Sequence, residues 1–257
     1  MRAARPAPPA DSRVAAATTD TSSLAFPWTR RKAEKLSHRN ALGRLKSLGF
    51  APAVIYDIGA YRGGWTRLAS EVFPTARVVL LEANADHAAT LAALGHHYVI
   101  AALGAADGDR RPFHVPRAGD VTGASLYLEK TAHYAASNLN VRALETVRLD
   151  TLVARERLPA PDLVKIDVQG AELDVLAGAA ETLRGTQALI VEVSLVDYNR
   201  GAPLVADVMA ALDRAGWRCA DLCEVHRTAA NFVLQLDLLF VQPPLFAKYG
   251  AAAGILP

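Results

Sequence analysis

Three acidic residues each follow a short apolar segment: Asp57 follows VIY, Glu82 follows VVLL and Asp167 follows LVKI. Such segments are typical of buried parallel strands, and open parallel sheets bind ligands outside the carboxyl ends of their strands. Gly59 and Gly63 come soon after the first acid and leave no side chain between the backbone and a ligand. The spacing predicts a polar ligand site at one edge of a sheet, although the glycine turn alone fits a bare strand-to-helix connection equally well.

The turn from Asp57 to Gly63 reads D-I-G-A-Y-R-G, and its charge narrows the class of ligand. Dinucleotide and P-loop sites need G-x-G-x-x-G or G-x-x-x-x-G-K-[ST], and this turn has neither pattern. A carboxylate before the first glycine repels a diphosphate and suits a cation, such as S-adenosylmethionine with its ammonium and sulfonium groups. Glu82, at the end of the next apolar segment, can accept hydrogen bonds from two ribose hydroxyls. The two acids together favour a nucleoside ligand without phosphate.

The elements that position these acids are predicted to alternate along the chain. Strand-type apolar segments are separated by helical segments, and connections of this length make neighbouring strands parallel, with helices on both faces. The sequence therefore predicts a doubly wound α/β fold whose last two strands form an antiparallel pair. The predicted strands cover 53–59, 76–84, 97–103, 111–115, 161–170, 187–194, 217–225 and 234–242, and the predicted helices cover 29–48, 65–73, 85–94, 171–183 and 203–215.

Composition divides the chain into three parts and one insertion. Residues 1–24 are rich in Ala, Pro, Ser and Thr and cannot bury enough apolar surface to become ordered, so a flexible tail is predicted. A helical segment over 25–50 then precedes the main domain at 51–245. Within this domain the polar connection at about 104–150 interrupts the alternation. A substrate lid, a homodimer contact and a surface hairpin without a ligand all fit this connection.

Charge, hydropathy and cysteine usage exclude several classes of protein. A net charge of +2 over 257 residues is too small for a nucleic-acid groove, which needs a concentrated basic face. No apolar run approaches the roughly 20 residues that cross a bilayer. The two cysteines, Cys219 and Cys223, support neither a disulfide framework nor a four-ligand zinc site. We therefore expect a cytoplasmic protein in a reducing compartment.

Five motifs follow one another along the chain: DIGAYRG at 57–63, LEAN at 81–84, LVKIDVQGAELDVLAGA at 163–179, IVEVS at 190–194 and DLLFVQ at 237–242. In their order and spacing the chain resembles the FkbM family of S-adenosylmethionine-dependent methyltransferases. Family members usually carry Asn where this chain has Tyr61, and often Glu where it has Gln169. The resemblance implies a Rossmann-like class I methyltransferase fold with a mostly parallel seven-stranded sheet and an antiparallel C-terminal strand. It also implies methyl transfer from S-adenosylmethionine, with S-adenosylhomocysteine as product, to a hydroxyl of a sugar, polysaccharide or natural product.

The resemblance implies roles for individual residues as well. The methionine part of the cofactor is expected beside Asp57, Gly59 and Gly63, and the ribose beside Glu82. Asp167 is expected next to the amino group or the sulfonium. The remaining cofactor contacts are assigned to Tyr61 and Ala83 at the rim and to Leu103 and Gly104 beside the adenine.

Methyl transfer to an aliphatic hydroxyl needs the acceptor oxygen in line with the methyl group and a base for its proton. Asp167 and Glu192, at the carboxyl ends of predicted central strands, are the candidates for this base. Lys165 lies two residues before Asp167, on the same face of its strand, and is predicted to neutralise or orient that carboxylate. A purely structural ion pair of Lys165 with Glu172 or Glu192 is the alternative.

A catalytic metal is not predicted. Metal-dependent methyltransferases that act on catechol-like acceptors place an Asp-Asn pair after the strand that here ends in Glu192-Val-Ser194. Two further functions stay open, namely methyl transfer to nitrogen or carbon of a small molecule and S-adenosylmethionine binding without catalysis. The expected acceptor is a small molecule or a glycan.

Overall fold

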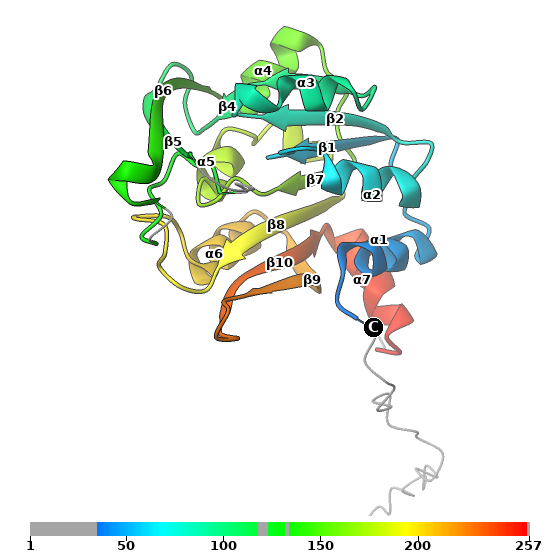
Figure 1. Ribbon diagram of the computed structural model, residues 1–257. Coiled ribbons are helices and arrows are strands. Elements are labelled where there is room, and N and C mark those ends of the chain that lie inside the picture. Colours follow the sequence, from blue (N-terminus) through cyan, green and yellow to red (C-terminus); the bar gives the residue numbers. More distant parts are fainter. Residues whose placement is uncertain (1–34, 118–122, 132–133, 256–257) are drawn as a thin grey trace, which may run out of the picture. The chain divides into compact units, whose positions relative to one another are not determined.

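The computed structural model describes residues 35–117, 123–131 and 134–255 of the chain (Figure 1). These residues belong to one compact unit, Glu34–Pro257. The predicted tail at 1–24 and the start of the predicted helix at 29 lie outside the described residues.

A seven-stranded sheet forms the centre of this unit (Figure 1). Its first five strands pair in parallel, and β10 runs antiparallel to both of its neighbours. The strand order reverses between β1 and β7, so this is where a ligand site is expected. The predicted doubly wound sheet with an antiparallel C-terminal strand is thus confirmed. Across the sheet the order is β3 (His97–Ile100), β2 (Arg77–Glu82), β1 (Val54–Ile58), β7 (Leu163–Ile166), β8 (Ala188–Ser194), β10 (Val233–Val241) and β9 (Arg218–Arg227).

Helices cover both faces of the sheet because the strand side chains alternate between two apolar cores. Among the described residues, no helix is both long and apolar enough to span a membrane. One core joins the sheet to α1 (His38–Ser47), α2 (Gly64–Val72), α3 (Ala88–Ala92) and α7 (Pro243–Ala252), and the other joins it to α4 (Leu149–Glu156), α5 (Glu172–Ala177) and α6 (Val205–Arg214).

The face that carries α1 and α2 turns polar at the carboxyl edge of the sheet. On this face Ile55 and Ile190 are buried in the apolar core, whereas the next side chains along their strands are Asp57 and Glu192. Lys165 pairs with Asp57 across β1 and β7, and Asp237 pairs with Glu192 across β8 and β10. The two-residue period of the strands therefore brings a row of charged side chains to one edge.

Several elements differ from their predicted extents. The predicted strand at 97–103 splits after Ile100, because Ala101 makes the last hydrogen bond to β2 and the chain then leaves the sheet. The next residues form β4 (Ala102–Leu103), which pairs with β6 (Leu139–Val147), and β6 pairs with β5 (Arg110–Pro116) in a second, three-stranded sheet. The predicted insertion thus carries a sheet of its own.

Three predicted helices are shorter than expected, and two helices were not predicted. The helix predicted over 29–48 begins only at His38, because the Ser37 side chain caps it by accepting from Asn40 N. The segment at 85–94 begins as a 3₁₀ turn, Ala85–His87, before α3. The helix predicted over 171–183 ends at Ala177, where Gly178 lies against the backbone carbonyl of Gly104, and a 3₁₀ turn follows at Thr182–Gly185. The helices α4 and α7 were not predicted from the sequence.

Gly59 is the position where the sheet edge tolerates no side chain. Its φ is +76°, and a Cβ atom would lie 1.7 Å from the carbonyl oxygen of Asp167. We expect Gly59→Ala to lower the free energy of unfolding by about 2 to 5 kcal/mol, through left-handed strain and displacement of β7. Urea denaturation followed by circular dichroism measures this change.

Gly43→Ala is the matched control. Gly43 lies inside α1, and no atom lies within 4 Å of the added Cβ. This substitution should therefore raise the free energy of unfolding by about 0.5 to 1 kcal/mol. Equal small effects of the two substitutions would show that Gly59 is not constrained by β7.

Candidate active site

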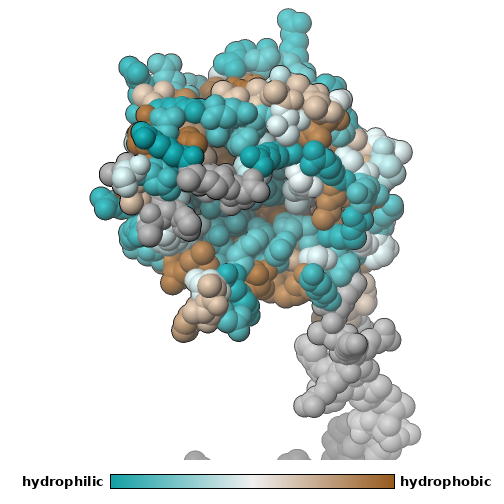
Figure 2. Space-filling view, in the orientation of Figure 1, coloured by the Kyte–Doolittle hydropathy of each residue, from teal (hydrophilic) through white to brown (hydrophobic). Residues whose placement is uncertain are grey.

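A cavity of about 450 Å³ opens at the carboxyl edge of the sheet, where the strand order reverses. Figure 2 shows a recess on this face with hydrophilic side chains gathered around it. The insertion closes one side of the cavity through Phe113 on β5 and Leu126 in the connection that follows. Of the residues predicted for the site, the cavity is lined by Gly59, Tyr61, Glu82, Ala83, Leu103, Lys165, Asp167 and Glu192.

Asp57, predicted to face the cofactor, lies beneath the cavity and does not line it. Its Oδ2 accepts a hydrogen bond of 2.6 Å from the Thr66 hydroxyl on α2, and its Oδ1 lies 3.9 Å from Lys165 Nζ. Burial raises the pKa of Asp57, and Lys165 opposes that shift. Asp57 can therefore act on a ligand only at a distance, by its charge and by its effect on Lys165.

Gly63 and Gly104 are also outside the cavity lining, and packing explains both glycines. Gly63 caps α2 at a φ of +73°, with Leu94 Cδ1 only 2.1 Å from the position of a Cβ. A Cβ on Gly104 would lie 2.8 Å from that of Thr146 on β6. The predicted contacts of these two glycines with a cofactor are not supported by their positions.

Glu82 ties together two loops of the cavity wall. Its carboxylate accepts hydrogen bonds of 2.7 Å from the backbone N–H groups of Tyr61 and Asn84. Burial raises the pKa of Glu82, and these two hydrogen bonds act in the opposite direction. Each carboxylate oxygen keeps a second lone pair, so Glu82 can still accept from a ligand hydroxyl.

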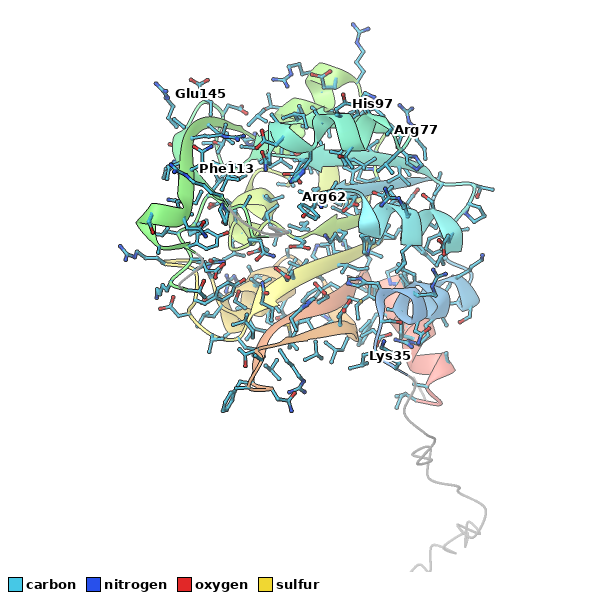
Figure 3. All side chains as sticks on the ribbon, in the orientation of Figure 1. Lys35, Arg62, Arg77, His97, Phe113 and Glu145 are labelled. Atoms are coloured by element: carbon cyan, nitrogen blue, oxygen red, sulfur yellow. The ribbon has the colours of Figure 1, made fainter. Side chains whose placement is uncertain are left out.

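Tyr61 lies on the cavity wall in a left-handed conformation, with a φ of +50°. Its ring meets the edge of His87 at 4.6 Å between ring centroids, and the Arg62 guanidinium lies 5.1 Å from the ring centroid. Figure 3 shows Arg62 at this turn and Phe113 on the small sheet. Among the described residues, no group hydrogen-bonds to the buried Tyr61 hydroxyl. The ring thus supplies an aromatic surface where the family usually has an amide.

Lys165 sits between two carboxylates at the floor of the cavity. Its Nζ donates to Asp167 Oδ2 at 2.8 Å and lies 3.9 Å from Asp57 Oδ1. Burial alone would lower the pKa of Lys165, but the charges of Asp167 and Asp57 outweigh it and raise the pKa. Lys165 therefore stays charged and orients Asp167, as the sequence predicts, rather than pairing with Glu172 or Glu192.

Gln169 bridges the two carboxylates that were the candidates for the base. Its amide nitrogen donates to Asp167 Oδ1 at 2.8 Å and to Glu192 Oε2 at 2.6 Å, from a backbone φ of +55°. Gln235 on β10 donates a second amide hydrogen bond of 2.6 Å to the same oxygen of Glu192. Burial, followed by the charges of Asp167 and Asp237, raises the pKa of Glu192 well above its usual range. A glutamate at 169 would add a third acid to this cluster.

A cluster of histidine and aspartate completes the site, and the sequence analysis missed it. Asp237 on β10 lies 2.8 Å from His226 Nε2 and 3.1 Å from His38 Nε2, measured from Oδ2. His226 also lines the cavity. The available signal was an aspartate at the start of the apolar run LLFV. Of its two partners, His226 is 11 residues away on β9, but His38 on α1 is 199 residues away.

The fold and the site together define a class of protein. The strand order, the antiparallel β10 and an acid-lined cavity beyond the switch point are those of a Rossmann-like class I methyltransferase. The sequence pattern of the Methyltransferase FkbM domain matches residues 57–219, which is more than half of the 257 residues. The chain belongs to this family.

Two characterised relatives share shorter segments with the chain. Hexuronic acid methyltransferase AglP of Haloferax volcanii is 31% identical over 75 residues, which cover 29% of this chain and 31% of the relative. The 2-O-methyltransferase NoeI of Sinorhizobium fredii is 42% identical over 59 residues, which cover 23% of this chain and 24% of the relative. The matches thus span less than a third of the length of either relative.

Solved structures of methyltransferases are similar at low identity. The methyltransferase FkbM from Methylobacillus flagellatus aligns with a TM-score of 0.44 at 18% identity, over 72% of this chain and 43% of that one. The precorrin-6y C5,15-methyltransferase from Geobacter metallireducens aligns with a TM-score of 0.44 at 15% identity, over 82% and 93% of the two chains.

Glu172 allows a test of the buried electrostatics next to the cavity. It is 4% exposed, its Oε1 accepts from Gly170 N at 2.9 Å, and burial raises its pKa to about 7. Above the unfolded-state pKa the folded protein holds a proton that the unfolded chain has released, so stability falls as the pH rises toward 7. The free energy of unfolding of Glu172→Gln, relative to that of wild type, should therefore increase by about 2 kcal/mol from roughly pH 5 to pH 7.5.

Urea denaturation at the two pH values measures the difference. Glu145→Gln is the control, because Glu145 is exposed on β6 (Figure 3). Parallel pH dependences of wild type and Glu172→Gln would contradict a raised pKa of Glu172.

Proposed function

We propose that the protein transfers a methyl group from S-adenosylmethionine to a hydroxyl oxygen of a sugar. The observation that carries this proposal is that the segment matching the FkbM family folds around the cavity and supplies Glu82, Asp167 and Glu192 to it. The names of the two relatives, a hexuronic acid methyltransferase and a 2-O-methyltransferase, support a sugar hydroxyl as the acceptor.

The cavity suits this cofactor in size and charge. A volume of about 450 Å³ lies in the range of roughly 300 to 1,000 Å³ that is usual for ligand pockets. Apolar side chains of Leu103, Phe113 and Leu126 offer a surface for adenine, and Glu82 offers acceptors for ribose hydroxyls. Asp167, held by Lys165, can pair with an ammonium group. When bound, S-adenosylmethionine supplies a methyl group already activated on a sulfonium.

The opposite side of the cavity suits a polyhydroxylated acceptor. Gln169, Gln235 and His226 line it and present amide and imidazole groups, which both donate and accept hydrogen bonds. Side chains of this kind bind sugar hydroxyls, and they position an acceptor oxygen without carrying a net charge against it. Positioning supplies much of the rate of such transfers, because the donor is already activated.

Cofactor binding tests the first half of the proposal. Isothermal titration should show S-adenosylhomocysteine binding to wild type, and Glu82→Ala should weaken it by about 1 to 3 kcal/mol through lost hydrogen bonds. Glu145→Ala is the matched control, since Glu145 is exposed on β6. No binding by the folded wild type would refute the cofactor assignment, and an unchanged affinity of Glu82→Ala would refute the role of Glu82.

Acceptor screening tests the second half. Wild type should transfer labelled methyl groups from S-adenosylmethionine to at least one member of a panel of methyl hexosides and methyl hexuronides, as detected by mass spectrometry. An ether-linked methyl on a ring carbon's oxygen is the expected product. Transfer only to amines or to carbon acceptors, included in the same panel, would contradict O-methylation.

A further inference from the structure

His226 is more accessible than the two buried carboxylates beside it on the β9 and β10 side of the cavity, Asp237 and Glu192. Its side chain is 38% exposed, compared with 4% for Asp237 and 6% for Glu192. The Nε2 atom lies 2.8 Å from Asp237 Oδ2. Within the described part of the chain, no side chain or backbone group hydrogen-bonds to Nδ1. The ring is thus held by one nitrogen and has the other available.

A second histidine fixes the state of Asp237. His38 Nδ1 accepts a hydrogen bond of 3.1 Å from the indole N–H of Trp65, so the neutral ring carries its proton on Nε2. That Nε2 then donates to Asp237 at 3.1 Å. Although burial would raise the pKa of Asp237, the hydrogen bonds from His226 and His38 lower it below its usual range. Asp237 is therefore an ionised acceptor that requires a donor from His226.

We propose that His226, oriented by Asp237, is the general base that accepts the proton of the acceptor hydroxyl. This proposal rests on the proposed function. As the oxygen–carbon bond forms and the sulfur–carbon bond breaks, the bonding pair stays on sulfur and the hydroxyl proton passes to Nδ1 of His226. The resulting imidazolium donates from Nε2 to the Asp237 carboxylate, which stabilises the positive charge. The proton then leaves to water.

The two carboxylates predicted as bases are less suited to this role. The oxygens of Asp167 already bind the ammonium of Lys165 and the amide of Gln169, both at 2.8 Å. Glu192 is buried, and its Oε2 accepts amide hydrogen bonds from Gln169 and Gln235. The geometry instead gives both carboxylates a positioning role, with Gln169 holding them in place.

The surroundings of His226 define its pH dependence. The hydrogen bond to Asp237 raises the pKa of His226 above its ordinary value, and burial of the ring opposes this shift. The base form is then complete only above that raised pKa, so the rate should increase with pH through it. The charged and titratable groups that act on the ring are Asp237 on β10, Glu224 on β9, Glu192 on β8 and Asp167 after β7. Two further groups act through these carboxylates, since Lys165 pairs with Asp167 and His38 on α1 pairs with Asp237.

The tautomer of His226 tests the geometry without any acceptor. Nitrogen NMR of the full chain labelled with ¹⁵N-histidine, with S-adenosylhomocysteine added, assigns the His226 signals by their loss in His226→Asn. At alkaline pH the proposal predicts a proton on Nε2 and a free lone pair on Nδ1. A proton on Nδ1 would overturn it, since the lone pair would then face Asp237.

Kinetics with a sugar found in the acceptor panel test the chemistry. His226→Asn should lower kcat by about 100-fold or more, with the affinity for S-adenosylhomocysteine changed less than about threefold. His97→Asn is the matched control, because His97 is exposed on β3, at the sheet edge opposite β9 (Figure 3). In Asp237→Asn, the rise of kcat/KM with pH should shift to lower pH, which a merely structural role would not produce.

Three outcomes separate this proposal from the proposed function. Absence of S-adenosylhomocysteine binding by wild type would refute the proposed function itself. Normal turnover of His226→Asn would overturn only the role of the base. Loss of wild-type turnover on chelation, restored by Mg²⁺, would also overturn it, because a metal ion would then be activating the hydroxyl. If the Asp237→Asn protein fails to fold, the tautomer of His226 and the turnover rate of His226→Asn still test the proposal.

Discussion

The carboxyl edge of the sheet depends on the ion pairs that the buried ammonium of Lys165 forms with two aspartates. The ammonium lies 2.8 Å from Asp167 and 3.9 Å from Asp57, and Asp57 is fully buried. Removing one partner of such a buried pair typically costs about 3 to 5 kcal/mol, because an uncompensated charge is left inside the protein. Lys165 thus allows the strands to end in carboxylates while the same face of the sheet keeps an apolar core two residues earlier.

The site that results has two halves with different chemistry. On the β1 and β2 side, Glu82 and the glycine turn face an apolar wall from the small sheet, an arrangement that suits a nucleoside. On the β8 to β9 side, amides and a histidine replace apolar groups, an arrangement that suits hydroxyls. Gln169 and Asp167 lie at the junction, where the strand order reverses. The antiparallel β10 brings Asp237 beside His226, which the proposed proton transfer requires.

Local sequence patterns predicted the parallel strands and their terminal acids, because apolar runs and turn glycines act over a few residues. The same patterns gave the wrong position for Asp57, which was predicted to face the ligand because it precedes the glycine turn. The alternation of side chains puts it under α2 instead, hydrogen-bonded to Thr66. They also failed for His226, since its contact with Asp237 depends on the register of β9 with β10, and the state of Asp237 depends on His38 of α1. Neither the register of two paired strands nor a contact with a distant helix leaves a periodic signal in the sequence.

The claim central to this account is that one cavity holds the cofactor between β1 and β2 and leaves the histidine side free for the acceptor. A crystal structure of the wild-type chain with S-adenosylhomocysteine tests it most directly. The account predicts ribose hydroxyls hydrogen-bonded to Glu82, adenine against the small sheet, and the sulfur facing the space before His226. A ligand bound outside this cavity, or with its ribose away from Glu82, would contradict the account.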